Sequence, residues 1–120
     1  MARISEGGED VNVIVDLSET KKINSISLGC HQDVRSWIFY PKQVEYWTSN
    51  DDINYDYQGK LFANFSDKIE GSFQKEFTLK VKDLKARYIK IKAKNYGVCP
   101  EWHLGAGGKT WVFVDEITIK

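Results

Sequence analysis

The chain contains 120 residues, a length that suits one domain built around a single hydrophobic core. Its 17 basic and 17 acidic residues balance and form no dense basic cluster, so the composition excludes a protein steered toward nucleic acid. The apolar runs are too short for a membrane span, and residues 1–6 lack the apolar region of a signal peptide. We expect one domain over residues 1–120, excised from a longer protein if it acts outside the cytoplasm.

Alternating apolar and polar residues predict seven short β-strands, and no window shows sustained helical spacing. In the first strand, Val11, Val13 and Val15 share one face. Residues 1–10 are expected to form a poorly defined N-terminal segment. The strands are expected at 11–17, 23–28, 43–48, 55–62, 73–81, 87–96 and 111–119. This pattern indicates an all-β fold, an antiparallel sandwich or jelly roll.

The connections between these strands fall into two groups. If successive strands run antiparallel, alternate connections lie at the same end of the sandwich. The longer connections, which would share one end, are 29–42, 63–72 and 97–110, and the shorter ones, at the other end, are 18–21, 49–54 and 82–86. The end with the long connections would collect residue types that stack on flat ligands and hydrogen-bond to hydroxyls. These residues are His31, Asp33, Arg35, Trp37, Phe39, Tyr40, Tyr96, Trp102 and His103.

The stretch 101–111 carries two tryptophans and a histidine beside three glycines in four residues. This glycine content disfavours a helix and is poor for a strand. The aromatic rings are therefore either a packed loop base or a stacking surface for a ligand, and the residues leave both alternatives open.

The two cysteines, Cys30 and Cys99, lie outside any Cys-x-x-Cys or metal-ligand spacing. Two thiols are favoured, with a disulfide as the alternative. The only histidines, His31 and His103, form no tight ligand cluster in the sequence, so zinc is not expected.

Neighbouring acidic residues do not indicate catalysis in this chain. Adjacent strand residues point to opposite faces, so Asp115 and Glu116 cannot act together on one bond. No nucleophile, base and orienting group are suggested together, so we expect a domain that is not an enzyme. The competing class is a hydrolase or lyase with His31 or His103 as its base. Arg87, at a strand start, is expected to pair with a carboxylate across the sheet.

Five stretches together resemble the discoidin domain, also called the coagulation factor V/VIII C-type domain. The most specific marks are Ala-Arg-Tyr-Ile-Lys-Ile at 86–91 and Ser-Asn-Asp at 49–51. The Ser-Asn-Asp turn ends the stretch 44–51, and the other stretches are 13–17, 23–28 and 114–117. The resemblance covers about residues 11 to 120 and implies a galactose-binding-like jelly roll of eight strands. Family members usually begin earlier than this chain, so the sheet is expected to be N-terminally truncated, with an uncovered edge.

A narrower resemblance rests on residues 32–41, 94–97 and 102–111. These segments are similar to the C-terminal module of bacterial secreted β-N-acetylhexosaminidases, or chitobiases, particularly those of gut Bacteroides. The resemblance implies a parent glycoside hydrolase that is secreted, periplasmic or held at the cell surface. The partners it implies are carbohydrate ends of N-acetylglucosamine or galactose type and the catalytic domain of the same parent chain, with no nucleic acid and no membrane span.

The resemblance also suggests roles at the end with the long connections. Related carbohydrate modules bind sugar hydroxyls with a histidine and an arginine from loops there, and His31 with Arg35 fits that pattern. The full candidate carbohydrate site is His31, Asp33, Arg35, Trp37, Asn95, Trp102 and His103. Each of these residues has a structural alternative, which is to fix or fill its own loop.

The candidate metal residue is Glu116, which matches the family's C-terminal calcium ligand. The loop that completes this site in the family is absent from the sequence, so no cofactor is expected. Two functions remain in competition: an accessory module that binds terminal sugars, and a structural module that packs on its catalytic domain and positions it without binding sugar.

Overall fold

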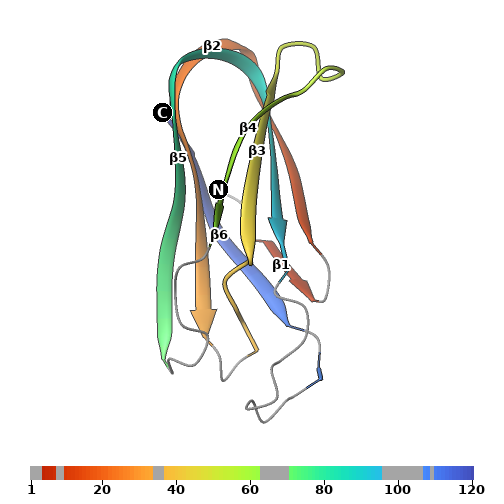
Figure 1. Ribbon diagram of the computed structural model, residues 1–120, viewed down its shortest axis with the longest axis vertical. Coiled ribbons are helices and arrows are strands. Elements are labelled where there is room, and N and C mark those ends of the chain that lie inside the picture. Colours follow the sequence, from red (N-terminus) through yellow and green to blue (C-terminus); the bar gives the residue numbers. More distant parts are fainter. Residues whose placement is uncertain (1–3, 8–9, 34–36, 63–70, 96–106, 109) are drawn as a thin grey trace.

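The computed structural model describes residues 4–7, 10–33, 37–62, 71–95, 107–108 and 110–120. Six strands form one antiparallel sheet in the order β1-β6-β2-β5-β3-β4 (Figure 1). Their bounds are β1 Ile4–Gly7, β2 Val11–Asp33, β3 Gln43–Ser49, β4 Asp56–Phe62, β5 Ser72–Lys94 and β6 Trp111–Ile119. The all-β antiparallel fold predicted from the sequence is therefore confirmed. Among the described residues, none forms a helix long and apolar enough to cross a membrane.

The two longest strands bend over and take part in both layers of a sandwich. β2 and β5 have 23 residues each and pair along almost their whole length. Figure 1 shows both strands rising along one side, curving over and descending along the other. One layer, here the β6 layer, contains β1, β6, residues 25–33 of β2 and residues 72–80 of β5. The other, the β3 layer, contains β3, β4, residues 11–16 of β2 and residues 88–93 of β5.

The bend corrects one prediction, since the connections expected at 18–21 and 82–86 are not hairpin turns but curved parts of β2 and β5. Register shifts between Asp16 and Lys21 and between Ile23 and Ser25 produce the curvature. Ser18 has a φ of 75° and Asp83 a φ of 48°, which change the strand direction locally. Because each bent strand supplies one segment to each layer, the sandwich contains the eight strand segments that the family resemblance implies.

Two further differences lie at strand ends. No element was predicted before residue 11, yet β1 pairs with β6 from Ile4↔Val114 to Gly7↔Trp111. Four residues are too few to show a period in sequence, and this strand is defined by its partner. β2 also runs on to Asp33, five residues beyond the predicted strand end at Leu28. His31 and Asp33 therefore stand on a strand and not in a loop.

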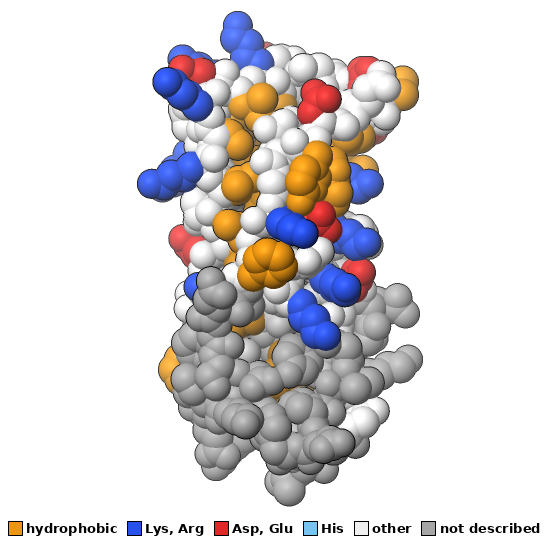
Figure 2. Space-filling model, in the orientation of Figure 1, with side chains coloured by type: hydrophobic (Ala, Val, Ile, Leu, Met, Phe, Trp, Pro, Cys, Tyr) orange, Lys and Arg blue, Asp and Glu red, His pale blue; other side chains and the backbone are white. Residues whose placement is uncertain are grey.

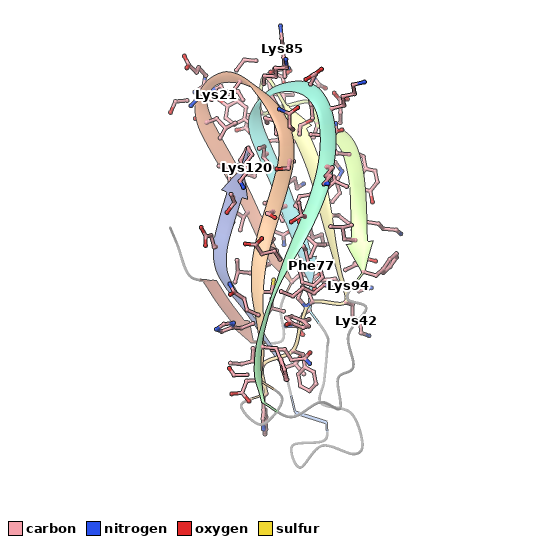
Figure 3. The ribbon with its side chains drawn as sticks, turned by 90° about the vertical axis from the view of Figure 1, so that its left-hand side faces the viewer. Lys21, Lys42, Phe77, Lys85, Lys94 and Lys120 are labelled. Atoms are coloured by element: carbon pink, nitrogen blue, oxygen red, sulfur yellow. The ribbon has the colours of Figure 1, made fainter. Side chains whose placement is uncertain are left out.

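The core lies between the two layers and consists of the residues that the alternation predicted to face inward. Tyr46 of β3 reaches across it, and its hydroxyl donates a hydrogen bond to the backbone oxygen of Phe77 in β5. The Phe77 ring meets the ring of Tyr40 edge-on, with 5.9 Å between ring centres. Burial raises the pKa of Tyr46 well above its usual range, so the hydroxyl stays protonated as the donor. Figure 3 shows Phe77 within the sandwich, between the chains of the two layers.

One side of the sandwich closes where β4 approaches the first half of β5. A Cβ added at Gly59 of β4 would lie 3.3 Å from Cδ1 of Leu79. The absence of a side chain at this position lets the Leu79 side chain cover the strand directly. β4 therefore remains an edge strand of the sheet while its inner face is packed.

The short connections gather at one end, as the antiparallel argument predicted. Thr20 in the bend of β2 donates to Oδ1 of Asn50 over 3.3 Å, and Nδ2 of Asn50 contacts the backbone oxygen of Lys85 in the bend of β5 at 3.5 Å. We call this end the arch end. Lys21 and Lys85 lie there in Figure 3, whereas Lys42 and Lys94 lie together much closer to the opposite end, here called the loop end.

Candidate functional site

The end of β2 leads into a tight turn that presents Trp37 at the loop end. Asp33 and Ile38 form an antiparallel bridge in which each backbone N–H donates to the other's oxygen, over 2.8 Å and 3.0 Å. Trp37 has a φ of 64°, which is uncommon for a bulky residue. Its side chain is 38% exposed. The turn thus holds a large ring at the surface on a strained backbone.

His31 and Asp33 share one face of β2, beside this turn. The inward residues of the same segment, Cys30 and Gln32, are buried, whereas His31 and Asp33 are half-buried. Because strand residues two apart point the same way, His31 and Asp33 both face outward from the β6 layer. The structure therefore brings together two of the predicted site residues on a rigid strand, next to the turn with Trp37.

The base of the β2–β3 connection is packed and not exposed. Phe39 and Tyr40 are buried, so these two rings fill the interior at the loop end instead of forming a ligand surface. Oε1 of buried Gln32 accepts a hydrogen bond of 3.3 Å from the backbone N–H of Tyr40. Of the aromatic residues predicted in this connection, Trp37 is the one that the structure leaves at the surface.

Asn95 belongs to a buried polar clamp that joins the ends of β5 and β6. Its Nδ2 donates to the backbone oxygen of Thr110 over 3.2 Å, and Thr110 Oγ1 donates to its Oδ1 over 2.7 Å. The Asn95 backbone N–H donates to Asp10 Oδ1 over 2.9 Å. Asn95 is 6% exposed and Thr110 is fully buried. This geometry suits a residue that fixes the loop end, which is the structural alternative stated for Asn95.

Sequence reasoning did not single out Thr110, Asp10 or Gln32, all of which shape this end. Threonine, aspartate and glutamine are ordinary loop residues, and no pattern in the chain marks them as buried or paired. Arg35, Trp102 and His103 lie outside the described residues, as do Cys99 and the stretch 96–106. Their assignment to the carbohydrate site stays a prediction.

Glu116, the candidate calcium ligand, is exposed on β6. Its cross-strand neighbour on β2 is Gly29, and Thr118 Oγ1 lies 3.5 Å from its Oε1. Calcium takes six to eight oxygen ligands, yet no three acidic, histidine or cysteine side chains come together within the described part of the chain. The assignment of Glu116 as a calcium ligand stays a prediction.

Arg87 forms the cross-sheet ion pair that was predicted for it. Its Nε lies 2.9 Å from Asp16 Oδ1 and its second guanidinium nitrogen lies 3.1 Å from Oδ2, so the contact is bidentate. The guanidinium holds the pKa of the Asp16 carboxyl below its usual range. This pair joins β2 to β5 in the β3 layer, so the predicted structural role of Arg87 is confirmed.

The fold and its loop end define a class of protein: antiparallel jelly-roll sandwiches that carry their irregular connections at one end. The F5/8 type C domain matches residues 4–116, so the chain belongs to the F5/8 type C, or discoidin, family. This match confirms the resemblance stated from the sequence.

Solved structures support the same fold. CBM32-1, from a family 31 glycoside hydrolase of Clostridium perfringens, is 17% identical with a TM-score of 0.63; the match covers 98% of this chain and 75% of that one. CBM32-3, also from a family 31 glycoside hydrolase of Clostridium perfringens, is 14% identical with a TM-score of 0.61. The match covers 98% of this chain and 70% of that one. The fold is therefore that of these modules.

Two further likenesses carry less weight. The C-terminal domain of a chitobiase from Bacteroides fragilis is 20% identical, and the match covers 93% of this chain and 66% of that one. Its TM-score is 0.45, which is too low to support an inference about the fold. An uncharacterised ATP-binding protein of Methanocaldococcus jannaschii is 34% identical over 83 residues, which are 68% of this chain. The chain spans only 23% of that curated relative's length.

Proposed function

We propose that this chain is a non-catalytic carbohydrate-binding module that binds terminal sugars at the loop end. The observation that carries the proposal is Trp37, a large ring at the surface on a turn with positive φ. Backbone strain of this kind is maintained only where the surrounding structure fixes it, and it is common at ligand sites. Two polar side chains, His31 and Asp33, stand on the neighbouring strand end.

The chemistry of these residues suits a sugar. The C–H groups on one side of a pyranose pack well against an aromatic face, a role for Trp37 and for Trp102 as assigned from the sequence. His31 and Arg35 would donate hydrogen bonds to hydroxyls, and Asp33 would accept them. Asn95 would support the site without touching the sugar, because its buried hydrogen bonds to Thr110 fix the backbone at the loop end.

The proposal extends to the parent protein. The modules CBM32-1 and CBM32-3 come from a glycoside hydrolase, and we infer that this chain is likewise an accessory module of a secreted, periplasmic or surface-held glycoside hydrolase of β-hexosaminidase type. Its partners would be a carbohydrate and the catalytic domain of the same parent chain. No calcium is included in the proposal.

The test is an NMR titration of the 120-residue chain with N-acetylglucosamine, N-acetylgalactosamine, galactose and chitobiose. We expect amide shifts in residues 29–42 and 97–110 that Trp37→Ala and Trp102→Ala each abolish with the fold intact. The matched control is Ile53→Ala, which removes an 80% exposed side chain at the arch end and leaves binding unchanged.

Three results would contradict the proposal. No shifts at millimolar sugar would favour the structural role, in which the module packs on its catalytic domain. Shifts confined to 49–54 or 82–86 would place the site at the arch end. A turnover of chromogenic N-acetylglucosaminides that His31→Ala or His103→Ala removes would show an enzyme instead.

A further inference from the structure

The outer face of the β3 layer carries exposed aromatic rings interleaved with lysines. One row across four strands is formed by Ile14, Lys90, Trp47 and Tyr57, which the registers of β2, β5, β3 and β4 place side by side. Figure 2 shows hydrophobic and basic side chains next to one another on the face over β3 and β4. We define the aromatic–lysine face as Trp47, Tyr57, Lys60, Phe62 and Lys90.

Tyr57 is a fixed ring with an open side. Its ring meets that of Trp47 edge-on, with 5.4 Å between centres and 65° between planes. Burial and the neighbouring Glu45 carboxylate raise its pKa. The residue is nevertheless 50% exposed. A ring held edge-on against Trp47 but open on a face loses little conformational entropy when a ligand packs on it.

Two lysines of this face present their ammonium groups beside the rings. Lys90 Nζ lies 5.3 Å from the Trp47 ring centre and 5.9 Å from that of Tyr55, and Lys60 Nζ lies 5.3 Å from the Phe62 ring centre. Neither lysine makes an ion pair with any residue in the described ranges, whereas Lys92 on the same face lies 3.7 Å from Asp10. Glu45 of β3 is the cross-strand neighbour of Lys60, and its Oε1 accepts a hydrogen bond of 3.0 Å from Nε2 of Gln43. Both ammonium groups therefore stand outside any ion pair of the described residues and can turn toward an acidic ligand.

The spacing of the exposed rings sets the size of the ligand. Tyr57 is opposite Trp47 and Phe62 is opposite Gln43, four residues apart on β3. At about 3.3 Å per strand residue, the backbone positions of the two rings on β4 are about 13 Å apart. One sugar ring cannot reach both, and Lys60 lies between them on the same strand. The arrangement of ring, cation and ring fits a chain of sugars with an acidic group in its middle.

We propose that the aromatic–lysine face is a second carbohydrate surface, which binds an acidic oligosaccharide such as a chain of uronic acids. Sugar faces pack on Tyr57 and Phe62, and carboxylates of the ligand pair with Lys60 and Lys90. Charge complementarity favours this occupant, because a neutral sugar chain or an apolar protein surface would bring no negative charge to Lys60 and Lys90. The surface is separate from the loop end and does not depend on Trp37.

The experiment is an NMR titration of the whole chain with a galacturonate tetrasaccharide and with its methyl ester, in which a methyl group on each carboxyl removes the negative charge. We expect shifts in β3, β4 and residues 88–93 with the acid, and binding about tenfold weaker with the ester. Tyr57→Ala should weaken binding of the acid about tenfold. Lys60→Gln should abolish most of the preference for the acid while keeping the fold.

Two control variants separate this surface from the others. Ile53→Ala removes an exposed apolar side chain at the arch end and should change nothing, and Trp37→Ala should affect only the sugars proposed for the loop end. Equal binding of acid and ester, no shifts on this face, or unchanged affinity in Tyr57→Ala would overturn the inference. Self-association that Tyr57→Ala removes in sedimentation, without any binding of the acid, would instead identify the face as a contact between two copies.

Discussion

The arch end and the loop end of this sandwich are held together in different ways. At the arch end, the turn between β3 and β4 is closed by Asp51, whose carboxylate accepts from the backbone N–H groups of Ile53 and Asn54 and from the Ser49 hydroxyl. These bonds are short-range and mostly exposed. At the loop end, Asn95 and Thr110 bond to each other across 15 residues in a buried site.

The difference shows which end depends on the rest of the fold. A turn built from neighbouring residues forms wherever its sequence allows, because its bonds close small loops. A buried clamp forms only when β5 and β6 are already in place, and each of its polar groups costs free energy if left unpaired. The loop end can therefore carry Trp37 on a strained backbone. The arch end closes the connections between strands.

The largest effect should come from the core that both ends share. Phe77→Ala removes a ring that packs on Tyr40 and lies under the Tyr46 hydrogen bond, so we expect a loss of about 3–5 kcal/mol in the free energy of unfolding. Urea unfolding followed by tryptophan fluorescence measures it, and Ile53→Ala serves as the exposed control, within about 0.5 kcal/mol of the unchanged chain. Hydrogen exchange should show both ends losing protection together; loss at one end only would mean that the ends are independent.

A smaller effect, limited to the loop end, should follow from Asn95→Ala. The change removes both bonds to Thr110, and we expect a loss of about 1–3 kcal/mol in the free energy of unfolding because the remaining groups are buried. Hydrogen exchange should rise at the ends of β5 and β6 and stay unchanged at 49–54. Thr110→Val, which keeps the shape and removes the hydroxyl, should reproduce part of the loss. Equal deprotection of the arch end would contradict the separation of the two ends.

The smallest effect should be found at the arch end and should depend on pH. The backbone N–H groups of Asn54 and Ile53 hold the pKa of Asp51 well below its usual range. Because the folded pKa is the lower one, the ionised carboxylate stabilises the fold above the ordinary value of 3.8 and this stability is lost as the pH falls toward the folded pKa.

Asp51→Asn keeps an acceptor oxygen and removes the charge. The difference in urea midpoint between the unchanged chain and this variant should be largest near about pH 6 and should shrink toward about pH 2. Asp83→Asn, whose ion pair with Lys22 is exposed, is the matched control at the same end. A difference that stays constant over this range would show that the turn does not rely on the Asp51 charge.

Much of the fold was predictable because burial leaves a period of two in the sequence. Inward positions such as Ile26, Leu28, Ile89 and Ile91 are fully buried, as the alternation indicated. The grouping of connections at two ends followed from antiparallel order alone, and the contacts of Asn50 bear it out. Arg87 was predictable as well, since an arginine at a strand start needs a carboxylate within reach.

The candidate site was predictable only in part. Trp37 was singled out because a large ring in a polar connection is informative by itself, and His31 and Asp33 because of their residue types. The strand that carries those two residues could not be predicted, because the stretch 29–33 shows no apolar alternation of its own. It becomes a strand by pairing with β5 and β6. The role of Asn95 was equally hidden, because its partner Thr110 is defined only by contact in space.

The sequence by itself determined the fold class, the inward face of nearly every strand and the family, because those depend on local periodicity and on local motifs. Only the tertiary structure decided that β2 and β5 bend into both layers, that Ile4–Gly7 forms a strand, and that Trp47 lies between Tyr57 and Lys90 on one face. A bend and a hairpin turn need the same polar, exposed residues, so their sequences look alike. They differ in which backbone groups pair across the sheet, and that pairing involves residues far apart in the chain.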